Sequence, residues 1–136
     1  MSDLVLSFEV PGPPVTKKRP RVTRGRGGYT PADTRRWEQA VGTYALAARA
    51  DAKLRQPLLE PVAVYIELQL NGRRGDLDNY AKSVLDALNG VVFEDDSQVE
   101  LLLVYRVASE VEKTRVTVRR ACHPSAHEKA QAGVEG

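Results

Sequence analysis

Hydrophobic and polar residues alternate along three stretches of the chain, residues 4–10, 62–70 and 114–119. This period of two is typical of strands that have one buried face. A fourth stretch, residues 99–107, is mostly apolar without alternation, which predicts a strand covered on both faces. A short turn near residues 109–112 would join it to the last strand. The pattern therefore predicts four strands.

Two other stretches have apolar residues at helical spacing and predict two main helices. The first begins at Thr30-Pro31, where threonine can cap the helix and proline favours its first turn, and it runs to about Ala52. The second covers residues 78–89, with Asp78 as a plausible cap and Asn89-Gly90 as the stop signal. We expect one α+β domain, an α/β-sandwich-like arrangement of two main helices on a mixed, mainly antiparallel sheet.

The length of 136 residues suits one domain with one core, which we assign to residues 1–120. Residues 121–136 show no periodicity and are expected to form a flexible tail. The single cysteine excludes an intramolecular disulfide, and no apolar stretch approaches the ~20 residues of a membrane helix. No signal peptide is evident, so we expect a cytoplasmic protein with no membrane partner.

Charge is distributed unevenly along the chain, although the net charge is only +2. Within residues 17–36, eight side chains are basic and one is acidic. Within residues 76–100, seven are acidic and one is basic. Such asymmetry suits a protein that attracts a polyanion with one segment and binds cations with another.

The basic segment overlaps a glycine-rich stretch, residues 15–29, which we expect to be a loop. Arginine and lysine in such a loop bind nucleic-acid phosphates, although a solvated charged loop has the same composition. Two further arginines directly precede the acidic segment, where a scissile phosphate would approach. The candidate DNA-binding residues are Lys17, Lys18, Arg19, Arg21, Arg24, Arg26, Arg73 and Arg74.

The acidic segment carries the candidate chemistry. Asp76 and Asp78 would point to the same side if this stretch is extended, and Lys82 lies one helical turn after Asp78. Asp95 or Asp96, from the loop after the helix, would have to complete the set. Carboxylates suit Mg²⁺ or Mn²⁺, and metal-assisted hydrolysis of a phosphodiester needs this combination of acids and a lysine.

Each of these residues also has an ordinary structural interpretation. Asp78 can be a helix cap, Lys82 and Asp86 a surface pair, and Asp95-Asp96 part of a turn. Histidine chemistry is disfavoured because both histidines lie in the tail, which argues against a Ser-His-Asp or Cys-His arrangement. A zinc site made by Cys122 and the two tail histidines is a minor alternative.

Three motifs in the acidic region match a known pattern, and the match extends loosely to residues 4–120. They are Gly75-Asp76-Leu77-Asp78-Asn79 through Lys82, then Leu85-Asp86-Ala87-Leu88-Asn89-Gly90-Val91-Val92, and Glu94-Asp95-Asp96-Ser97-Gln98-Val99. Together they resemble the RusA family of Holliday junction resolvases, the crossover junction endodeoxyribonucleases.

The resemblance implies a RusA-like fold and a homodimer that binds four-way DNA junctions and makes paired symmetric nicks in recombination and repair. The implied cofactor is Mg²⁺, with Mn²⁺ as an alternative, and no small-molecule cofactor is implied. Asp76, Asp78 and Asp96 correspond to the metal-binding acids, with Asp95 a helper, and Lys82 to the catalytic lysine. One departure is that no aromatic residue directly precedes Asp76.

Symmetric nicking needs two sites related by a two-fold axis, which also favours a homodimer. The helix at 34–52 and the strand at 99–107 are the candidate interfaces. Two other functions stay open: a non-catalytic DNA-binding module, and a metal-dependent nuclease for flaps, single strands or other branched DNA.

Overall fold

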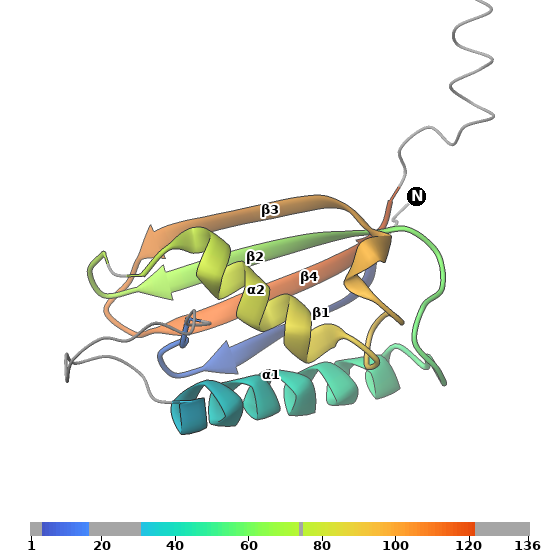
Figure 1. Cartoon of the computed structure of the whole chain (residues 1–136), viewed down its shortest axis with the longest axis horizontal. Helices are drawn as coiled ribbons and strands as arrows, with labels where there is room; N and C mark the ends of the chain where they lie inside the picture. Colours follow the sequence, from blue (N-terminus) through green and yellow to red (C-terminus); the bar gives the residue numbers. More distant parts are fainter. Residues whose placement is uncertain (1–3, 17–30, 74, 122–136) are drawn as a thin grey trace, which may run out of the picture.

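Four strands form one mixed sheet, and two main helices lie on one face of it (Figure 1). The computed structural model describes residues 4–16, 31–73 and 75–121. The elements follow the order β1 (Leu4–Pro11), α1 (Pro31–Asp51), β2 (Val62–Leu70), α2 (Leu77–Leu88), the 3₁₀ turn η1 (Asp96–Gln98), β3 (Val99–Ala108) and β4 (Lys113–Arg120). These bounds confirm the predicted α+β domain and its four strands and two main helices.

The strand order is β1-β4-β2-β3. β4 pairs antiparallel with both β1 and β2, whereas β2 pairs parallel with β3. A parallel pair cannot be joined by a hairpin and needs a crossover, which α2 supplies here. The expectation of a mixed, mainly antiparallel sheet is therefore confirmed.

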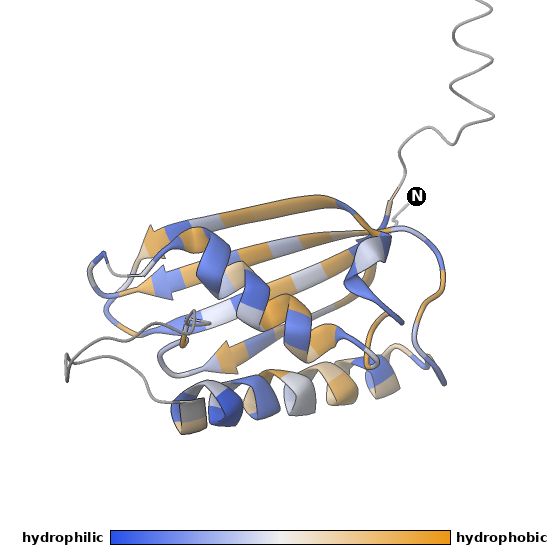
Figure 2. Ribbon diagram, in the orientation of Figure 1, coloured by the Kyte–Doolittle hydropathy of each residue, from blue (hydrophilic) through white to orange (hydrophobic). Residues whose placement is uncertain are grey.

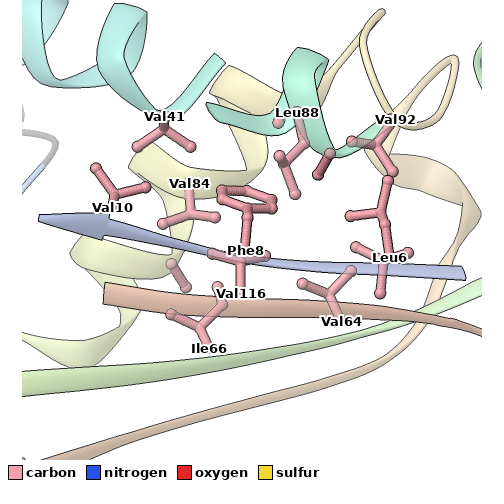
Figure 3. Packing of buried hydrophobic residues seen from close by; sticks show 14 of the residues in the cluster. Leu6, Phe8, Val10, Val41, Val64, Ile66, Val84, Leu88, Val92 and Val116 are labelled. Carbon is pink, nitrogen blue, oxygen red and sulfur yellow. The ribbon is translucent and has the colours of Figure 1, made fainter. Parts of the chain in front are cut away.

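The hydrophobic core lies between the helices and the sheet (Figure 3). Alternate residues of each alternating strand are buried in it, for example Phe8 from β1 and Ile66 from β2. Most of the intervening positions are polar, and Figure 2 shows the strands in alternating hydrophobic and hydrophilic colours. The helices contribute residues at helical spacing, including Val41 of α1 and the pair Val84 and Leu88 of α2, each fully buried. Within the described part of the chain, no helix is long and apolar enough to cross a membrane.

β3 departs from its predicted environment. The helices cover only one face of the sheet, and β3 is an edge strand, so the prediction of coverage on both faces is wrong for the single chain. Leu101, Leu103 and Tyr105 are 47, 48 and 41% exposed. An apolar run favours burial of a strand, but it does not show that the fold of a single chain provides the covering surface.

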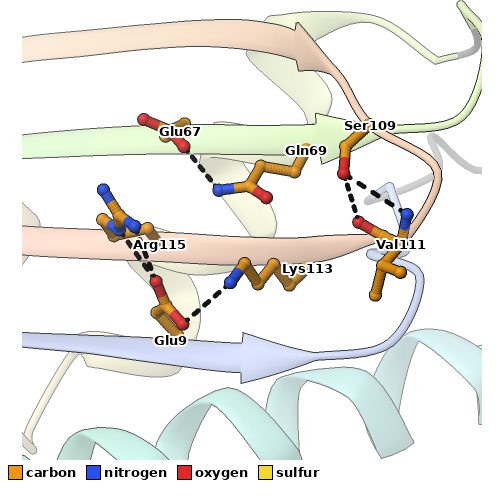
Figure 4. A network of polar contacts seen from close by, with 7 residues as sticks. All are labelled: Glu9, Glu67, Gln69, Ser109, Val111, Lys113 and Arg115. Atoms are coloured by element: carbon orange, nitrogen blue, oxygen red, sulfur yellow. Dashed lines mark hydrogen bonds and ion pairs between the residues drawn. The ribbon is translucent and has the colours of Figure 1, made fainter.

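The open face of the sheet carries a network of charged side chains (Figure 4). Glu9 on β1 accepts hydrogen bonds from Arg115 at 2.8 Å and from Lys113 at 3.2 Å, both on β4. Glu67 on β2 accepts from the Tyr105 hydroxyl at 2.6 Å. The hydrogen bonds from Arg115 and then Lys113 stabilise the charged carboxylate and lower the pKa of Glu9.

This shift gives a prediction about acid titration. A lowered pKa in the folded state means that Glu9 stabilises the fold above its unfolded pKa, and that this contribution is lost as the pH falls through the folded pKa. We expect the carboxyl carbon of Glu9 to titrate below its ordinary value of 4.5 when followed by NMR. Arg115→Gln should move the midpoint towards 4.5, and Lys113→Gln should move it less. An unshifted midpoint in the parent chain would contradict the network.

Candidate functional site

The first acidic segment lies at the N-terminus of α2. Asp76 occupies the N-cap position with extended backbone angles of φ −97° and ψ 137°, although its side chain makes no capping hydrogen bond. Its carbonyl accepts hydrogen bonds from the amides of Asn79 and Tyr80, both at 3.1 Å. Asp78 lies in the first helical turn, so the predicted cap at Asp78 is wrong by two residues. The two carboxylates are therefore not on one extended segment, but both lie at the positive end of the helix dipole, which favours negative charge.

The carboxylates of this segment are accessible. Asp76 and Asp78 are both exposed. Within the described part of the chain, the side chain of Asp76 has a single polar contact, a long hydrogen bond of 3.5 Å from the side-chain nitrogen of Asn79. Among the same residues, the Asp78 carboxylate makes no hydrogen bond or ion pair. Both acids can therefore accept a ligand without breaking a strong internal contact.

The loop that carries Asp76 is fixed from two sides. Gly75 has φ +77°, and a Cβ atom there would lie 2.6 Å from ring atoms of Tyr80, which is fully buried. On the other side, the Arg106 guanidinium on β3 donates to the Gly75 carbonyl at 3.0 Å. Sequence reasoning missed both supports. The available signal for Arg106 was a single basic residue inside a mostly apolar strand.

Lys82 lies on the exposed side of α2, one turn after Asp78. Its ammonium is 4.0 Å from the Asp86 carboxylate, and its side chain is 63% exposed. An exposed pair at this distance contributes little to stability. The contact with Asp86 is the surface pair that the structural interpretation of Lys82 expects. The Lys82 side chain is still largely exposed to solvent, one helical turn after Asp78.

The second acidic segment lies beyond the C-terminus of α2. Asp95 caps η1 through a reciprocal capping box: its carboxylate accepts from the Ser97 amide at 2.9 Å, and the Gln98 side-chain oxygen accepts from the Asp95 amide at 2.9 Å. The hydrogen bonds from Ser97 lower the pKa of Asp95. One oxygen of this carboxylate is therefore engaged within its own turn.

Gln98 also attaches this turn to the rest of the fold. Its side-chain nitrogen donates to the carbonyls of Leu58 and Glu60, both at 2.9 Å. Asp96, held in the same turn, differs from Asp95, because its carboxylate makes no hydrogen bond or ion pair with any described residue. A ligand at Asp96 would therefore break no internal contact, whereas one oxygen of Asp95 is held by its own turn.

One chain does not bring the two acidic segments together. The 12 residues of α2 separate them, which is about 18 Å at 1.5 Å per residue. The path along β3 gives a similar distance. Gly75 lies beside Arg106, and Arg106 is seven residues after Val99, so the two strand positions are roughly 23 Å apart at ~3.3 Å per residue. The two ends of α2 lie towards opposite ends of the sheet in Figure 1. Across residues 4–16, 31–73 and 75–121, no group of three acidic, histidine or cysteine residues could hold a metal ion.

Most of the predicted DNA-binding residues lie outside the described residues. Arg73 is described and exposed, two residues before Gly75. The segment 17–30, the neighbouring Arg74, and Cys122 with both tail histidines are not among the described residues. Their proposed roles stay predictions.

The described chain is thus an α+β domain with exposed or partly exposed carboxylates beyond both ends of its crossover helix. Comparison with known proteins gives the class directly, because the family model described as "Endodeoxyribonuclease RusA" matches residues 11–119. The chain belongs to this RusA family, which confirms the resemblance seen in the sequence. The match includes both acidic segments and the whole of α2.

The chain also has a relative in Bacillus subtilis (strain 168). The chain is 30% identical over 135 residues to "Uncharacterized protein YqaN", with 84% of this chain and 95% of that protein covered. The similarity therefore extends over nearly the full length of the relative.

The fixed loop before Asp76 gives a testable prediction with a matched control. Gly75 and Gly90 both have φ +77°, but a Cβ atom added at Gly75 would meet Tyr80, whereas one added at Gly90 would have no atom within 4 Å. Alanine at either position should cost about 1–2 kcal/mol of unfolding free energy from the left-handed backbone. Gly75→Ala should lose about 1–3 kcal/mol more, because the added methyl overlaps Tyr80. Denaturant unfolding measures both variants, and equal losses would contradict the close packing of Gly75 on Tyr80.

Proposed function

We propose that this protein is a metal-dependent endonuclease that resolves Holliday junctions by paired symmetric nicks, in DNA recombination and repair. Membership of an endodeoxyribonuclease family supports the class of reaction. The observation that carries the finer proposal is the accessibility of the family's acids: Asp78 and Asp96 have carboxylates without internal partners among the described residues.

The donor set fits a hard divalent cation. Carboxylate oxygens are the ligands that Mg²⁺ and Mn²⁺ prefer, and Asp76, Asp78 and Asp96 would supply them. When bound, such a cation polarises the phosphate and makes a water molecule more nucleophilic. Asp95 supports Asp96 by fixing the turn, since its own carboxylate is held by the Ser97 amide.

The chain's basic residues would handle the charge of the substrate. Lys82 projects from the same side of α2 as Asp78 and can donate to an oxygen of the phosphate as negative charge develops there. Arg73 lies at the approach to this end of the helix and can pair with the backbone phosphates. The basic segment 17–26 would add affinity that falls with salt concentration.

We further propose a homodimer in which Asp76 and Asp78 of one copy meet Asp96 of the other. This arrangement follows from the separation of about 18 Å along α2, which one chain cannot close without unfolding the helix. A two-fold axis would create two composite sites at once. Two sites match the two opposing strands that junction resolution must cut.

The first prediction concerns cleavage of a synthetic four-way junction. We expect paired nicks with Mg²⁺ or Mn²⁺ and none with EDTA. Asp78→Asn and Lys82→Ala should each lower the cleavage rate by on the order of 10²-fold or more while junction binding persists, because they remove charge at the reacting phosphate. Gel-shift and nicking assays on the same samples separate binding from cleavage. Cleavage that survives the chelator unchanged would refute metal dependence.

A non-catalytic DNA-binding module would instead bind the junction without cutting it under any metal condition. A nuclease for flaps or single strands would prefer those structures over the four-way junction in a competition panel. The same assays therefore distinguish the alternative functions.

The second prediction compares the two neighbouring acids. Asp96→Asn should lower cleavage by on the order of 10²-fold, because it weakens a metal ligand. Asp95→Asn should change cleavage much less, because asparagine caps a turn about as well as aspartate and keeps the bond from the Ser97 amide. Both variants are isosteric, so folding is matched. A larger loss in Asp95→Asn than in Asp96→Asn would reverse the assignment.

The third prediction tests whether a site is shared between copies. Asp78→Asn and Asp96→Asn should each cleave poorly alone, but a mixed dimer of the two would contain one complete site. Co-refolded mixtures should regain nicking of a single junction strand. A mixture of Asp76→Asn and Asp78→Asn is the control, since both changes fall in the same half-site and no complete site can form. If neither mixture recovers nicking, the shared site is wrong.

A further inference from the structure

An open groove lies between the outer edge of β1 and the C-terminal half of α1, which runs along the strand (Figure 1). Its volume is about 330 Å³. Residues 6–9 of β1 form one wall, and the helix together with the residue after it forms the other. The helical wall combines the exposed ring of Tyr44 with the short side chains of Ala47, Ala48 and Ala52, which leave room beside the strand.

The backbone of β1 has hydrogen-bonding groups that point outward at this edge. Opposite residues of an antiparallel pair alternate between those that exchange hydrogen bonds and those that do not. The Gly12 amide donates to the opposite carbonyl of Glu112 at 3.0 Å, so the exchanging pairs fall on the even-numbered residues of β1. The N–H and C=O groups of Ser7 and Glu9 therefore point away from β4. No strand of the described chain pairs with this side of β1.

This edge has little of the usual protection against pairing. Edge strands usually avoid new partners by means of exposed charges, prolines or bulges. The single charge in residues 4–10 is Glu9, and its carboxylate already pairs with Arg115 at 2.8 Å and Lys113 at 3.2 Å. Pro11 and a register shift lie at the two ends of β1. The segment between them is able to accept another strand.

One end of the groove is negatively charged. Asp51, the last residue of α1, is exposed, and its carboxylate makes no hydrogen bond or ion pair with a described residue. The helix dipole adds negative potential at the same end. Arg49, the basic residue of the last turn, donates instead to the Val91 carbonyl at 3.0 Å. A ligand that complements this groove therefore carries a positive charge at the Asp51 end.

We propose that the groove binds an extended segment of another protein, which adds a fifth strand to the sheet beside β1. The segment runs antiparallel to β1, the more stable of the two pairings, and its backbone pairs with Ser7 and Glu9. Alternate side chains of the segment lie in the groove against α1, and the side chains between them join the open face of the sheet. This interaction is independent of the proposed nuclease activity.

The lining of the groove defines the sequence that such a segment needs. Apolar side chains suit the part of the groove beside Tyr44 and Ala47, and a lysine or arginine suits the position beside Asp51. β1 and α1 run in opposite directions, so Asp51 lies towards the start of β1 (Figure 1). A segment antiparallel to β1 reaches that end last. Its basic residue therefore follows its apolar residues.

The first experiment follows binding of a peptide, acetyl-Thr-Val-Thr-Val-Thr-Lys-Thr-amide, to the isotope-labelled full chain by NMR. The valines and the lysine of this probe would face α1. We expect saturable shifts and slower hydrogen exchange at the amides of Ser7 and Glu9. Ala47→Arg should weaken binding on the order of ten-fold, because the longer side chain occupies the groove.

Ala50→Arg is the matched control for this variant. It makes the same change on the same helix, at an exposed position outside the groove, and should bind the peptide as the parent chain does. Circular dichroism checks that both variants are folded. Equal affinities of the two variants, or shifts that avoid Ser7 and Glu9, would overturn the proposal.

The second experiment tests backbone pairing directly. Ser7 and Glu9 face the open side of the sheet, so the two inner threonines of the peptide would lie opposite them and direct their N–H groups to β1. N-methylation of these threonines should abolish binding. N-methylation of the valines should cost far less, because their N–H groups would face solvent. Equal losses from the two modifications would exclude a fifth strand.

The third experiment tests the charge and the identity of the occupant. Asp51→Asn should lower affinity for the peptide about two- to five-fold, and should leave affinity for an analogue with glutamine in place of lysine unchanged. Equal losses for both peptides would remove the basic residue from the proposal. Shifts of Ser7 and Glu9 that grow with protein concentration in the absence of peptide would mean that a second copy fills the groove, and would overturn the assignment to another protein.

Discussion

The parallel pairing of β2 with β3 is the constraint on which the rest of the structure depends. Two neighbouring parallel strands need a connection that crosses the sheet, and α2 makes that connection while covering the core. The helix must therefore begin at one end of the sheet and finish near the other. Because the acidic segments flank the helix, the same crossover that completes the fold also separates the acids.

Each acidic segment is then held by contacts of its own. Tyr80 is buried against Gly75, and Arg106 reaches from the edge strand to the same glycine. At the other end of the helix, Gln98 joins the second acidic turn to the loop that precedes β2. The acids themselves contribute little to these contacts, except for Asp95. The fold therefore holds the backbone of both acidic segments in place. The carboxylates of Asp78 and Asp96 make no hydrogen bond or ion pair with a described residue.

Much of this could be predicted from the sequence. Alternation in β2 and the apolar stripe of α2 are local patterns with one physical cause, a single buried face, and both elements lie within one or two residues of their predicted bounds. The cap of α2 was misplaced, because Asp76 and Asp78 are both good capping residues and only the backbone of Asp76 is extended. The surroundings of β3 were also wrong, since an apolar strand has the same sequence whether a helix or another chain covers it.

The distance between the two acidic segments could not be predicted from the sequence, for a different reason. Spacing along the sequence gives the length of α2, but the return path depends on whether β3 runs parallel or antiparallel to β2. That choice is made by pairing between strands far apart in the chain. The resemblance to the family implies Asp76, Asp78 and Asp96 as a set, but the motif does not show that α2 separates them within one chain.

A helix that separates the proposed metal-binding acids in this way has a consequence for the control of activity. In the proposed dimer, neither copy holds a complete site, so the number of working sites follows the equilibrium between single and paired chains. At low concentration the specific activity would rise with the amount of protein present. A chain newly made or highly diluted would be harmless to DNA, and cutting would begin only where two copies gather on one substrate.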